Sequence, residues 1–267
     1  MTLLELKQVT KEYPLRLRRG NIKKKVAVHN VSFTISKGES LALVGESGSG
    51  KSTIAKLIMR IEKITSGQIL WNGHSIHSKQ LKDFAFYKNI QMVLQDSSAS
   101  LHPQMRVEEI LAEPIRNFFP NKKTWHEECI RLLDLVGLDR SFLKHVPNQL
   151  SGGQKQRVCI AKALAVKPEL IVFDESIASL DSPSQTSILE ILRTIQMQNG
   201  ISYLFITHDL QSTKQLCDRV AVMYQGEIVE TFTHWEQSQL THPYSQLLFE
   251  TMNHQCTDVS DGVPVLS

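Results

Sequence analysis

The chain has 267 residues, which is enough for one large globular domain or two small ones, and its 41% hydrophobic and 21% charged residues are ordinary for a globular protein. A formal net charge of +3 is too small to indicate a nucleic-acid partner. The four cysteines are scattered without a C-x-x-C pair, which fits a reducing compartment and argues against a disulfide framework or a zinc site. No apolar run approaches the length of a membrane span, and the first residues lack the core of a signal peptide.

The N-terminal part of the chain predicts two strands. Residues 4–9 are largely apolar, and apolar residues alternate over 31–35. Residues 14–25 carry six arginines and lysines, which is typical of a solvated hairpin loop, although a contact with acidic lipid headgroups or a partner is the alternative. Tyr13 stands at the end of the first strand and, taken alone, is expected to be a half-buried strand aromatic.

A phosphate-binding pattern follows. Residues 45–52 read Gly-Glu-Ser-Gly-Ser-Gly-Lys-Ser, which matches G-x-x-x-x-G-K-[ST]. An apolar strand over 41–44 precedes the pattern, and a helix that places Ile54, Leu57, Ile58 and Ile61 on one face is expected after it. Glycines let such a loop point successive N–H groups at phosphate oxygens. Lys51 would then reach the terminal phosphates, and the Ser52 hydroxyl would hold Mg²⁺.

The middle of the chain predicts a change from strands to helices. A short strand over 68–71 lies between two turn sequences, and another over 90–94 ends at Gln95. A polar amide at that place suits a ligand contact in an α/β fold, but a surface glutamine entering a loop is the simpler interpretation. Residues 97–165 are dominated by helical patterns and are predicted to form an insert. Within it, Thr124 and Glu127 have the spacing of a capping box, and Gly137 suits a helix C-terminus.

Residues 150–154 read Leu-Ser-Gly-Gly-Gln and predict a second helix N-terminus. Ser151 and Gln154 have capping-box spacing, and an apolar helix follows until shortly before Pro168. The glycines leave the free N–H groups of the first turn uncovered, so this end of the helix suits an anion such as a phosphate. An ordinary capped core helix explains the same residues.

An acidic pair follows the next buried strand. Residues 170–173 are apolar, and Asp174 and Glu175 come directly after them. Beside a phosphate loop, the first carboxylate can bind Mg²⁺ through water and the second can poise the attacking water. A helix with Ile188 on its inner face then leads to a strand over 201–206, which predicts a parallel βαβ unit. His208 lies just beyond that strand and, alone, is more simply a structural histidine. Residues 220–229 predict a hairpin, and residue 243 opens a short helix.

These motifs together resemble the ATP-binding subunit of an ABC transporter. The resemblance covers residues from about 3 to 250, and it rests on the order and spacing of residues 45–52, Gln95, 150–154, Asp174-Glu175, 179–181 and His208. It implies an α/β fold: a P-loop ATPase core with a mixed sheet, N-terminal antiparallel strands and a helical subdomain inserted at about 97–165. Residues 1–250 would form one ATP-binding domain, and residues 251–267 would be a disordered tail.

The same resemblance implies a role for each motif residue. Tyr13 would stack on adenine, and the phosphate loop with its first helical residues would bind the phosphates of ATP: Gly45, Glu46, Ser47, Gly48, Ser49, Gly50, Lys51, Ser52 and Thr53. Mg²⁺ would be held by Ser52, Gln95 and Asp174. Glu175 would be the general base, and His208 would contact the γ-phosphate. Ser151, Gly153 and Gln154 would grip the ATP held by the opposite subunit, and Asp181 would lie at the dimer seam.

Shorter stretches resemble the nickel and oligopeptide importer branch. They are residues 100–103 (Ser-Leu-His-Pro) and 241–245 (Thr-His-Pro-Tyr-Ser), with 157–166 and 205–210 most similar to the second ATPase subunit of nickel importers. The resemblance implies nickel or a nickel chelate as cargo, with peptides as the alternative. It also implies a heterodimer with a second ATPase subunit, two transmembrane permease subunits, an indirect partner in an extracytoplasmic binding protein, and a peripheral place on the cytoplasmic face of the cell membrane.

The sequence departs from the family pattern at two places, and three other classes of ATPase share some of its motifs. Residues 176–178 are Ser-Ile-Ala where the family usually has Pro-Thr-Ser, and only Cys256 stands in the tail, so no iron–sulfur cluster is expected. A chromosome or DNA-repair ATPase would insert a long heptad coiled coil, and a ribosome-associated factor would carry two cassettes. A regulatory cassette would usually lack the base. A non-transport ATPase therefore remains only a remote alternative.

Overall fold

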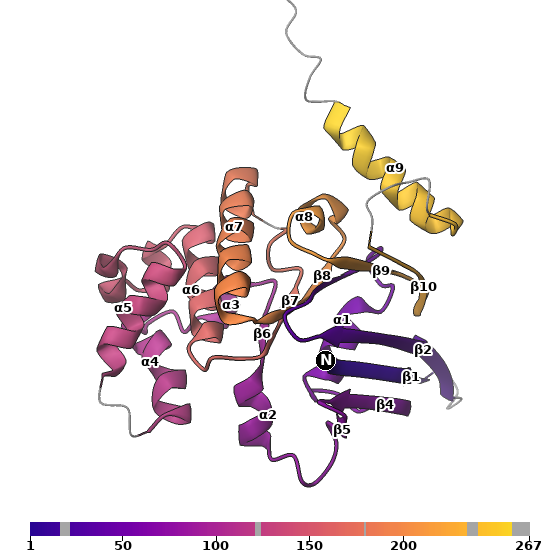
Figure 1. Ribbon diagram of the computed structural model, residues 1–267, viewed down its shortest axis with the longest axis horizontal. Coiled ribbons are helices and arrows are strands. Elements are labelled where there is room, and N and C mark those ends of the chain that lie inside the picture. Colours follow the sequence, from indigo (N-terminus) through magenta and orange to yellow (C-terminus); the bar gives the residue numbers. More distant parts are fainter. Residues whose placement is uncertain (17–21, 121–123, 179, 234–239, 258–267) are drawn as a thin grey trace, which may run out of the picture.

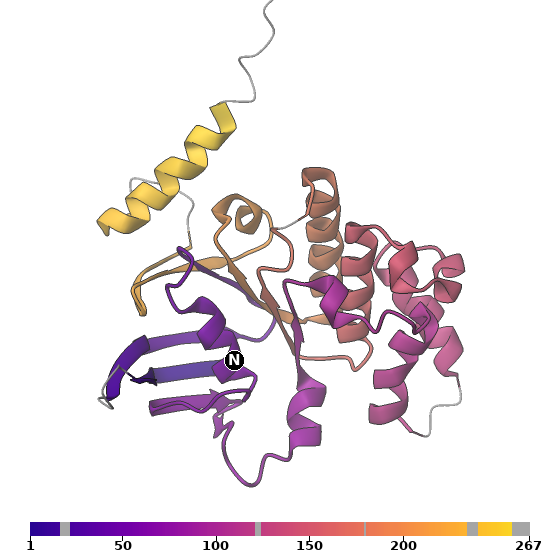
Figure 2. The same ribbon diagram turned by 180° about the vertical axis from the view of Figure 1, so that it is seen from behind.

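The computed structural model describes residues 1–16, 22–120, 124–178, 180–233 and 240–257, and it contains two sheets (Figure 1). One sheet has the strand order β2-β1-β4-β5, and the other has the order β10-β9-β3-β8-β7-β6. Helices α4, α5 and α6 gather at one side of the molecule, away from the first sheet, in both the front view and the rear view (Figure 2). The predicted α/β class with a helical insert is therefore confirmed.

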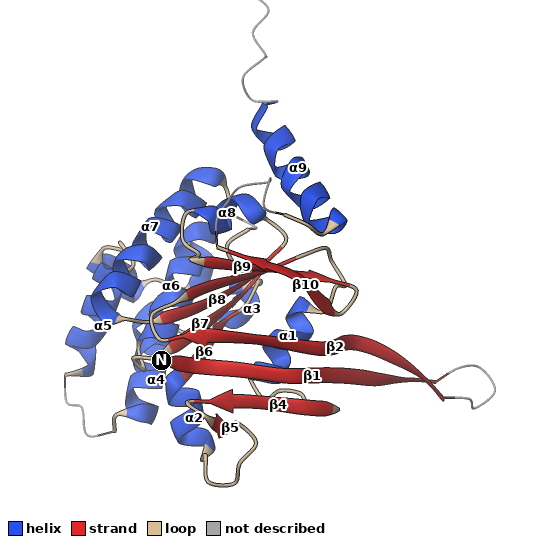
Figure 3. Cartoon of the chain, turned by 45° about the vertical axis from the view of Figure 1, so that its right-hand side comes forward, coloured by secondary structure: helices blue, strands red, loops and turns tan. Residues whose placement is uncertain are grey.

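The first sheet is antiparallel. Strand β1 (Thr2–Arg16) pairs with β2 (Ile22–Ser36) and with β4 (Ser66–Trp71), and β4 pairs with β5 (His74–Ser75). The ladder between β1 and β2 continues to the pair Arg16↔Ile22. The prediction of a loop over 14–25 was therefore wrong in extent, because cross-strand pairing orders most of this basic run (Figure 3). Arg18 and Arg19 lie outside the described residues.

The second sheet is mixed. Strands β3 (Ser40–Val44), β6 (Ile90–Val93), β7 (Leu170–Asp174), β8 (Ser202–Thr207) and β9 (Arg219–Tyr224) are paired in parallel, and β10 (Glu227–Phe232) is antiparallel to β9. This confirms the predicted parallel βαβ unit through β7 and β8 and the predicted hairpin of β9 and β10. The carboxyl ends of β3, β7 and β8 consequently lie at one edge, where open α/β sheets bind ligands.

Helices cover this sheet and form the insert. Their bounds are α1 (Lys51–Ile58), α2 (Asp83–Asn89), α3 (Ser97–Ser100), α4 (Val107–Phe118), α5 (Trp125–Leu135), α6 (Gly152–Leu164), α7 (Ser182–Asn199), α8 (Leu210–Lys214) and α9 (Pro243–Thr257). Two short 3₁₀ segments, Arg140–Lys144 and Pro147–Gln149, lead into α6. Helix α6 contacts α4 and α5 on one side and β6 on the other, so it joins the insert to the sheet.

Alternating residues of the central strands divide the core into two clusters. Ala42 and Val44 of β3 belong to the cluster with the helical insert, whereas Leu41 and Leu43 belong to the cluster with the first sheet and α1. All four side chains are completely buried. A strand buried on both faces has to be continuously apolar, which is why these strands were visible in the sequence. Burying each large aliphatic side chain contributes about 1.5–3 kcal/mol.

Three predicted boundaries differ from the structure. Helix α1 ends at Ile58 because the chain turns through Arg60 at a φ of 58°, and Ile61 is 64% exposed instead of packing with the helix. The Thr124 side chain does not cap α5, since its φ of −101° and ψ of 38° lie outside the extended conformation of an N-cap. Helix α9 continues to Thr257, so disorder does not begin at residue 251. Residues 258–267 lie outside the described part.

The predicted end of α5 at Gly137 is confirmed. Gly137 has a φ of 67°, and the N–H of Leu138 donates to the carbonyl of Leu133 at 2.9 Å. A left-handed glycine after the last helical turn allows this bond, which satisfies a terminal carbonyl. The capping box at Ser151 is also confirmed. There the Ser151 N–H donates to Gln154 Oε1 at 2.9 Å and the Gln154 N–H donates to Ser151 Oγ at 3.3 Å.

Candidate nucleotide site

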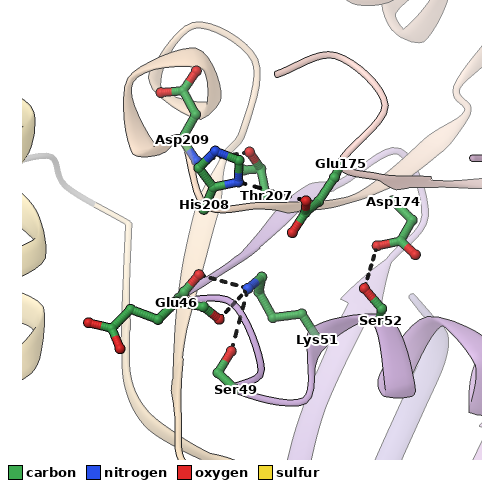
Figure 4. Close-up of polar contacts among 10 residues, drawn as sticks. Glu46, Ser49, Lys51, Ser52, Asp174, Glu175, Thr207, His208 and Asp209 are labelled. Carbon is green, nitrogen blue, oxygen red and sulfur yellow. Dashed lines mark hydrogen bonds and ion pairs between the residues drawn. The ribbon is translucent and has the colours of Figure 1, made fainter. Parts of the chain in front are cut away.

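The glycine-rich loop lies at the carboxyl end of β3, which pairs with β8 and β9, and β7 lies beyond β8. Figure 4 shows Lys51 and Ser52 on the loop side, facing Asp174, Glu175 and His208 from the neighbouring strands. The sheet topology causes this meeting, since β8 pairs with β3 and β7 pairs with β8 in parallel. Residues separated by more than 120 positions in the chain therefore face one another at a single edge.

Lys51 occupies the centre of the loop. Its side chain is nearly buried, and Nζ donates to the carbonyls of Gly45 at 2.7 Å and Glu46 at 2.8 Å. Burial lowers the pKa of Lys51, while the carboxylates of Glu175, Asp174 and Glu46 act in the opposite direction. Nζ also lies 3.5 Å from the hydroxyl oxygen of Ser49, and a buried ammonium group held by uncharged oxygens is a strong electrostatic site for an anion. The exposed carboxylate of Glu46 points away from Lys51 (Figure 4).

Two glycines are required by the close packing of this loop. A Cβ on Gly45 would lie 2.1 Å from the carbonyl oxygen of Met223, and one on Gly50 would lie 2.4 Å from that of Ala27. Gly50 also has a φ of 110°, which side chains rarely adopt. The loop is therefore fixed between β9 and β2 by contacts that leave no space for a side chain.

The Ser52 hydroxyl donates to Asp174 Oδ1 at 3.0 Å. Burial raises the pKa of the Asp174 carboxyl, although its bond to Ser52 and the charge of Lys51 oppose this effect. Hydroxyl and carboxylate oxygens are the ligands that Mg²⁺ prefers, and a partly buried carboxylate is stabilised by a cation. These residues fit a magnesium site. Gln95 follows β6, the neighbour of β7, and its side chain is exposed.

Glu175 is the residue that directly follows β7. Its Oε2 lies 3.8 Å from His208 Nδ1, and the Glu175 N–H donates to the carbonyl of Ile206 at 2.8 Å. Glu175 has a φ of 50°, which is uncommon for a residue other than glycine and turns its side chain toward the loop (Figure 4). The His208 side chain is 62% exposed, so this pair borders solvent where an attacking water is available.

A cavity of about 590 Å³ joins the loop to the first sheet. Residues from the loop, α1, β1 and β2, Glu175 and the turn between β9 and β10 line it: Tyr13, Lys25, Val26, Ala27, Ser47, Gly48, Gly50, Lys51, Ser52, Thr53, Glu175, Gln225 and Gly226. The volume lies in the range of small-molecule sites. The sequence analysis did not find Lys25, Val26, Ala27, Gln225 or Gly226, because they carry no motif and reach the cavity only through the sheet pairing.

Tyr13 lines this cavity and lies within β1 instead of at a strand end. Its hydroxyl donates to Glu62 Oε2 at 2.5 Å, and Lys11 Nζ lies 4.8 Å from the ring centroid. Burial, together with the bond to Glu62, raises the pKa of Tyr13. The ring is thus fixed at the cavity wall, in a position that suits stacking on a planar base.

The helix N-terminus at Ser151 is not part of this cavity. Within the described chain, none of residues 150–154 lines it. Gly153 instead packs at the start of α7, where an added Cβ would lie 3.0 Å from Ser184 Oγ. Asp181 caps the same helix by accepting the N–H of Ser184 at 3.1 Å, and hydrogen bonding to the Ser184 side chain, together with this N–H, lowers the pKa of Asp181. Ser179 lies outside the described residues. The N-terminus of α6 and the cavity at Lys51 are therefore separate places on the described chain.

Comparison with known proteins supports one family. The family model described as ABC transporter matches residues 28–178, more than half of the chain. The oligopeptide transport ATP-binding protein OppF of Lactococcus lactis subsp. lactis is 43% identical over 235 residues, covering 86% of this chain and 74% of that protein. The nickel import ATP-binding protein NikE of Escherichia coli O157:H7 is 42% identical over 235 residues, covering 86% of this chain and 87% of that protein.

Solved structures agree with this assignment. A dimeric ATP-binding cassette in a post-hydrolysis state, bound to ADP and inorganic phosphate, superimposes with a TM-score of 0.74 at 28% identity and covers 86% of this chain and 98% of its own. The cbiO1 protein from Clostridium perfringens has the same fold, with a TM-score of 0.78 at 24% identity, covering 97% of this chain and 96% of its own. Sequence, fold and site together place the chain in the ABC transporter family, as one of its ATP-hydrolysing subunits.

Proposed function

We propose that this chain energises an ABC importer for nickel or a nickel chelate. The proposed ATPase activity rests on one observation: Lys51, Ser52, Asp174 and Glu175 meet at one edge of the sheet. Within this group, Ser52 Oγ lies 3.0 Å from Asp174 Oδ1. The nickel part is supported by the covered share of each relative, since the identities of 42% and 43% do not separate the two. The matched region covers 87% of the nickel import relative but 74% of the Lactococcus oligopeptide relative.

Peptide import is the second candidate. OppF of Bacillus subtilis is 40% identical over 255 residues, which cover 94% of this chain and 82% of that protein. This match extends over more of the chain than the nickel import matches do. In both candidates the ATP site has the same residues and the same roles, so the choice concerns only the cargo.

ATP would occupy the cavity with its base at Tyr13 and its phosphates at the loop. Residues 45–53, which include Lys51, would bind the phosphates. Ser52, Gln95 and Asp174 would hold Mg²⁺. When bound, the ion would neutralise charge on the phosphate oxygens. Glu175 would accept a proton from the attacking water as general base, and His208, 3.8 Å from Glu175, would contact the γ-phosphate.

The site would be completed by a second cassette. Ser151, Gly153 and Gln154 would bind the γ-phosphate held by the opposite subunit through the N-terminus of α6. The absence of residues 150–154 from the described lining of the cavity supports this arrangement. ATP would then bias the equilibrium between an open and a closed dimer, because only the closed form contacts the nucleotide from both sides. We favour a heterodimer with a different ATPase subunit.

Two permease subunits would respond to the closing and opening of the ATPase dimer, and an extracytoplasmic binding protein would deliver the cargo. Between β6 and α6 lies a groove of about 220 Å³, lined by Gln91, Met92, Val93, Leu94, Ser100, Cys159, Lys162 and Ala163. Leu94 is 47% exposed there, directly before Gln95. This groove supports a protein contact beside the site. No helix within the described residues is long and apolar enough to span the bilayer, and we place the chain peripherally at the cytoplasmic face.

Uptake into whole cells tests this proposal. Host cells that lack their own nickel and peptide uptake systems would express the complete transporter with the wild-type chain, with E175Q or with E190Q. The last variant changes an exposed carboxylate on α7 in the same way and is the matched control. If E175Q loses uptake of radiolabelled nickel but keeps uptake of the labelled peptide, nickel import is supported. Loss of labelled peptide uptake alone assigns the chain to peptide import, and unchanged uptake of both contradicts the cargo proposal.

A further inference from the structure

The C-terminal helix reaches back to the phosphate loop through one tyrosine. Tyr244 lies in the first turn of α9, and its hydroxyl oxygen accepts the N–H of Glu46 at 2.8 Å, across 198 positions of the chain. Tyr244 is only 9% exposed. Glu46 is the second residue of the loop, so this bond joins the end of the described chain to the part that would receive phosphate.

Tyr244 stands on a well-anchored segment. Leu240 is 4% exposed and Phe249 is 5% exposed, and both pack in the core cluster that contains the helical insert. Glu230 of β10 accepts two hydrogen bonds from Thr241, one from its N–H at 2.7 Å and one from its hydroxyl at 2.9 Å. A side chain held by such a support loses little additional entropy when it makes a hydrogen bond.

The ring of Tyr244 is also held in place. It packs on the ring of Tyr224 at the end of β9, with centroids 4.4 Å apart and an angle of 30° between the planes. Burial raises the pKa of Tyr244, so the hydroxyl keeps its proton at neutral pH. The stacked pair directs the Tyr244 hydroxyl at the backbone of the loop.

The bond to Tyr244 differs from the other bonds of the loop. The carbonyl of Glu46 accepts from Lys51 Nζ at 2.8 Å, but Lys51 is also the group that phosphates attract. The Tyr244 bond is made by the N–H of the same residue, and neither Glu46 nor Tyr244 is among the described residues that line the cavity. Another bond joins the loop to the turn between β9 and β10, where the Gly226 N–H donates to the carbonyl of Ser49 at 3.0 Å. The Tyr244 bond therefore holds the loop from outside the cavity.

We propose that Tyr244 is a positioning residue, which holds the phosphate loop in its nucleotide-receiving shape from the C-terminal segment. This inference rests on the proposed nucleotide site. A loop that already has the bound shape does not have to be ordered when ATP arrives, so removing the bond should weaken binding without removing any group that touches ATP. The ATP site would thus depend on residues far outside the matched region 28–178.

The variants Y244F and Y224F in the purified full-length chain test this inference. Each removes one hydroxyl from the same stacked pair, but the Tyr224 hydroxyl accepts only from the side chain of Gln225, at 3.0 Å, among the bonds of the described residues. Titration calorimetry with ATP and Mg²⁺ should give a Kd about 3- to 10-fold higher for Y244F, the loss expected for one hydrogen bond. Y224F should stay within about twofold of the wild type.

Two further measurements separate positioning from a general structural role. In steady-state hydrolysis by the assembled transporter, Y244F should raise KM by a similar factor and leave kcat within about twofold. Thermal unfolding of the nucleotide-free chain should shift by less than about 2 °C. In the wild-type chain without nucleotide, the Glu46 amide should exchange with deuterium at least about tenfold more slowly than in an unfolded peptide.

Several results would overturn the inference. They are a Y244F affinity within twofold of the wild type, an equal loss in Y224F, a Y244F melting temperature lowered by more than about 5 °C, or an unprotected Glu46 amide. Failure of the wild-type chain to bind ATP at all is a different result. It would reject the nucleotide site itself and not the positioning by Tyr244.

Discussion

The hydroxyl of Ser52 lies 3.0 Å from the carboxylate of Asp174, although 122 positions separate the two residues. Ser52 is the second residue of helix α1 after β3, and Asp174 ends β7 on the far side of β8. The pair joins the phosphate loop to the acidic strand end that carries Glu175.

Replacing Glu175 by glutamine should separate ATP binding from hydrolysis. The amide keeps the size of the side chain but cannot accept a proton from water, so kcat should fall by at least about 10²-fold while ATP affinity changes little. The variant should accumulate a closed dimer, measurable by size-exclusion chromatography in ATP. E190Q on the exposed face of α7 is the control. Near-normal turnover by E175Q would remove Glu175 from the role of base.

Replacing Lys51 by alanine should abolish most nucleotide affinity. Its ammonium group is nearly buried and is held only 2.7 Å from the carbonyl of Gly45, where a phosphate would gain a charged hydrogen bond. Loss of such a contact corresponds to about 1.5–3 kcal/mol, or roughly 10- to 150-fold in Kd. Calorimetry with ATP should detect this change. K79A, at an exposed position, should bind normally, and an unchanged K51A affinity would contradict the phosphate-loop assignment.

Replacing Ser151 by arginine should separate the two half-sites. Ser151 is exposed, and it lies outside the described lining of the cavity at Lys51. The isolated subunit should therefore bind ATP within about twofold of the wild type, whereas the assembled transporter should lose nearly all hydrolysis because a bulky cation fills the dimer contact. Calorimetry and a phosphate-release assay give the two readings. Loss of binding in the isolated subunit would reject the composite site.

Replacing Gly50 by alanine should destabilise the chain and the loop together. The new Cβ would meet the carbonyl oxygen of Ala27 at 2.4 Å, at a φ of 110°. The strain should lower the free energy of unfolding by about 1–3 kcal/mol and weaken ATP binding. G152A is the matched control for stability, because nothing lies within 4 Å of its added Cβ. Equal denaturation midpoints in urea for G50A and the wild type would show that the loop can move aside.

Much of the core was predictable from the sequence because its strands are buried on both faces. Residues 41–44 and 170–173 are continuously apolar, as are residues 203–206 of the third strand. Lys51, Ser52, Asp174 and Glu175 follow the first two of these strands. The capping box at Ser151 and the turn at Gly137 were visible for a similar reason. Both depend on local backbone geometry that a few residue types satisfy.

Boundaries decided by long-range contacts were not predictable. The described residues of the basic run, 14–16 and 22–25, form strand because β1 and β2 pair as far as Arg16 and Ile22. Ile61 is exposed because Arg60 turns the chain away. No local sequence pattern predicts this strand pairing or the exposure of Ile61. The prediction that Thr124 caps α5 was also wrong. The residue types fit a capping box, but the backbone at Thr124 does not take the extended conformation of an N-cap.

The sequence by itself determined which groups are predicted to carry the chemistry, because phosphate and magnesium chemistry requires particular residue types at short, fixed spacings. Only the tertiary structure decided which groups meet. It brought Ala27, Gln225 and Gly226 to the cavity wall, left residues 150–154 apart from it, and placed the Tyr244 hydroxyl 2.8 Å from the backbone nitrogen of Glu46. The physical reason is that such contacts arise from strand order and packing between segments distant in the chain, which residue spacing does not encode.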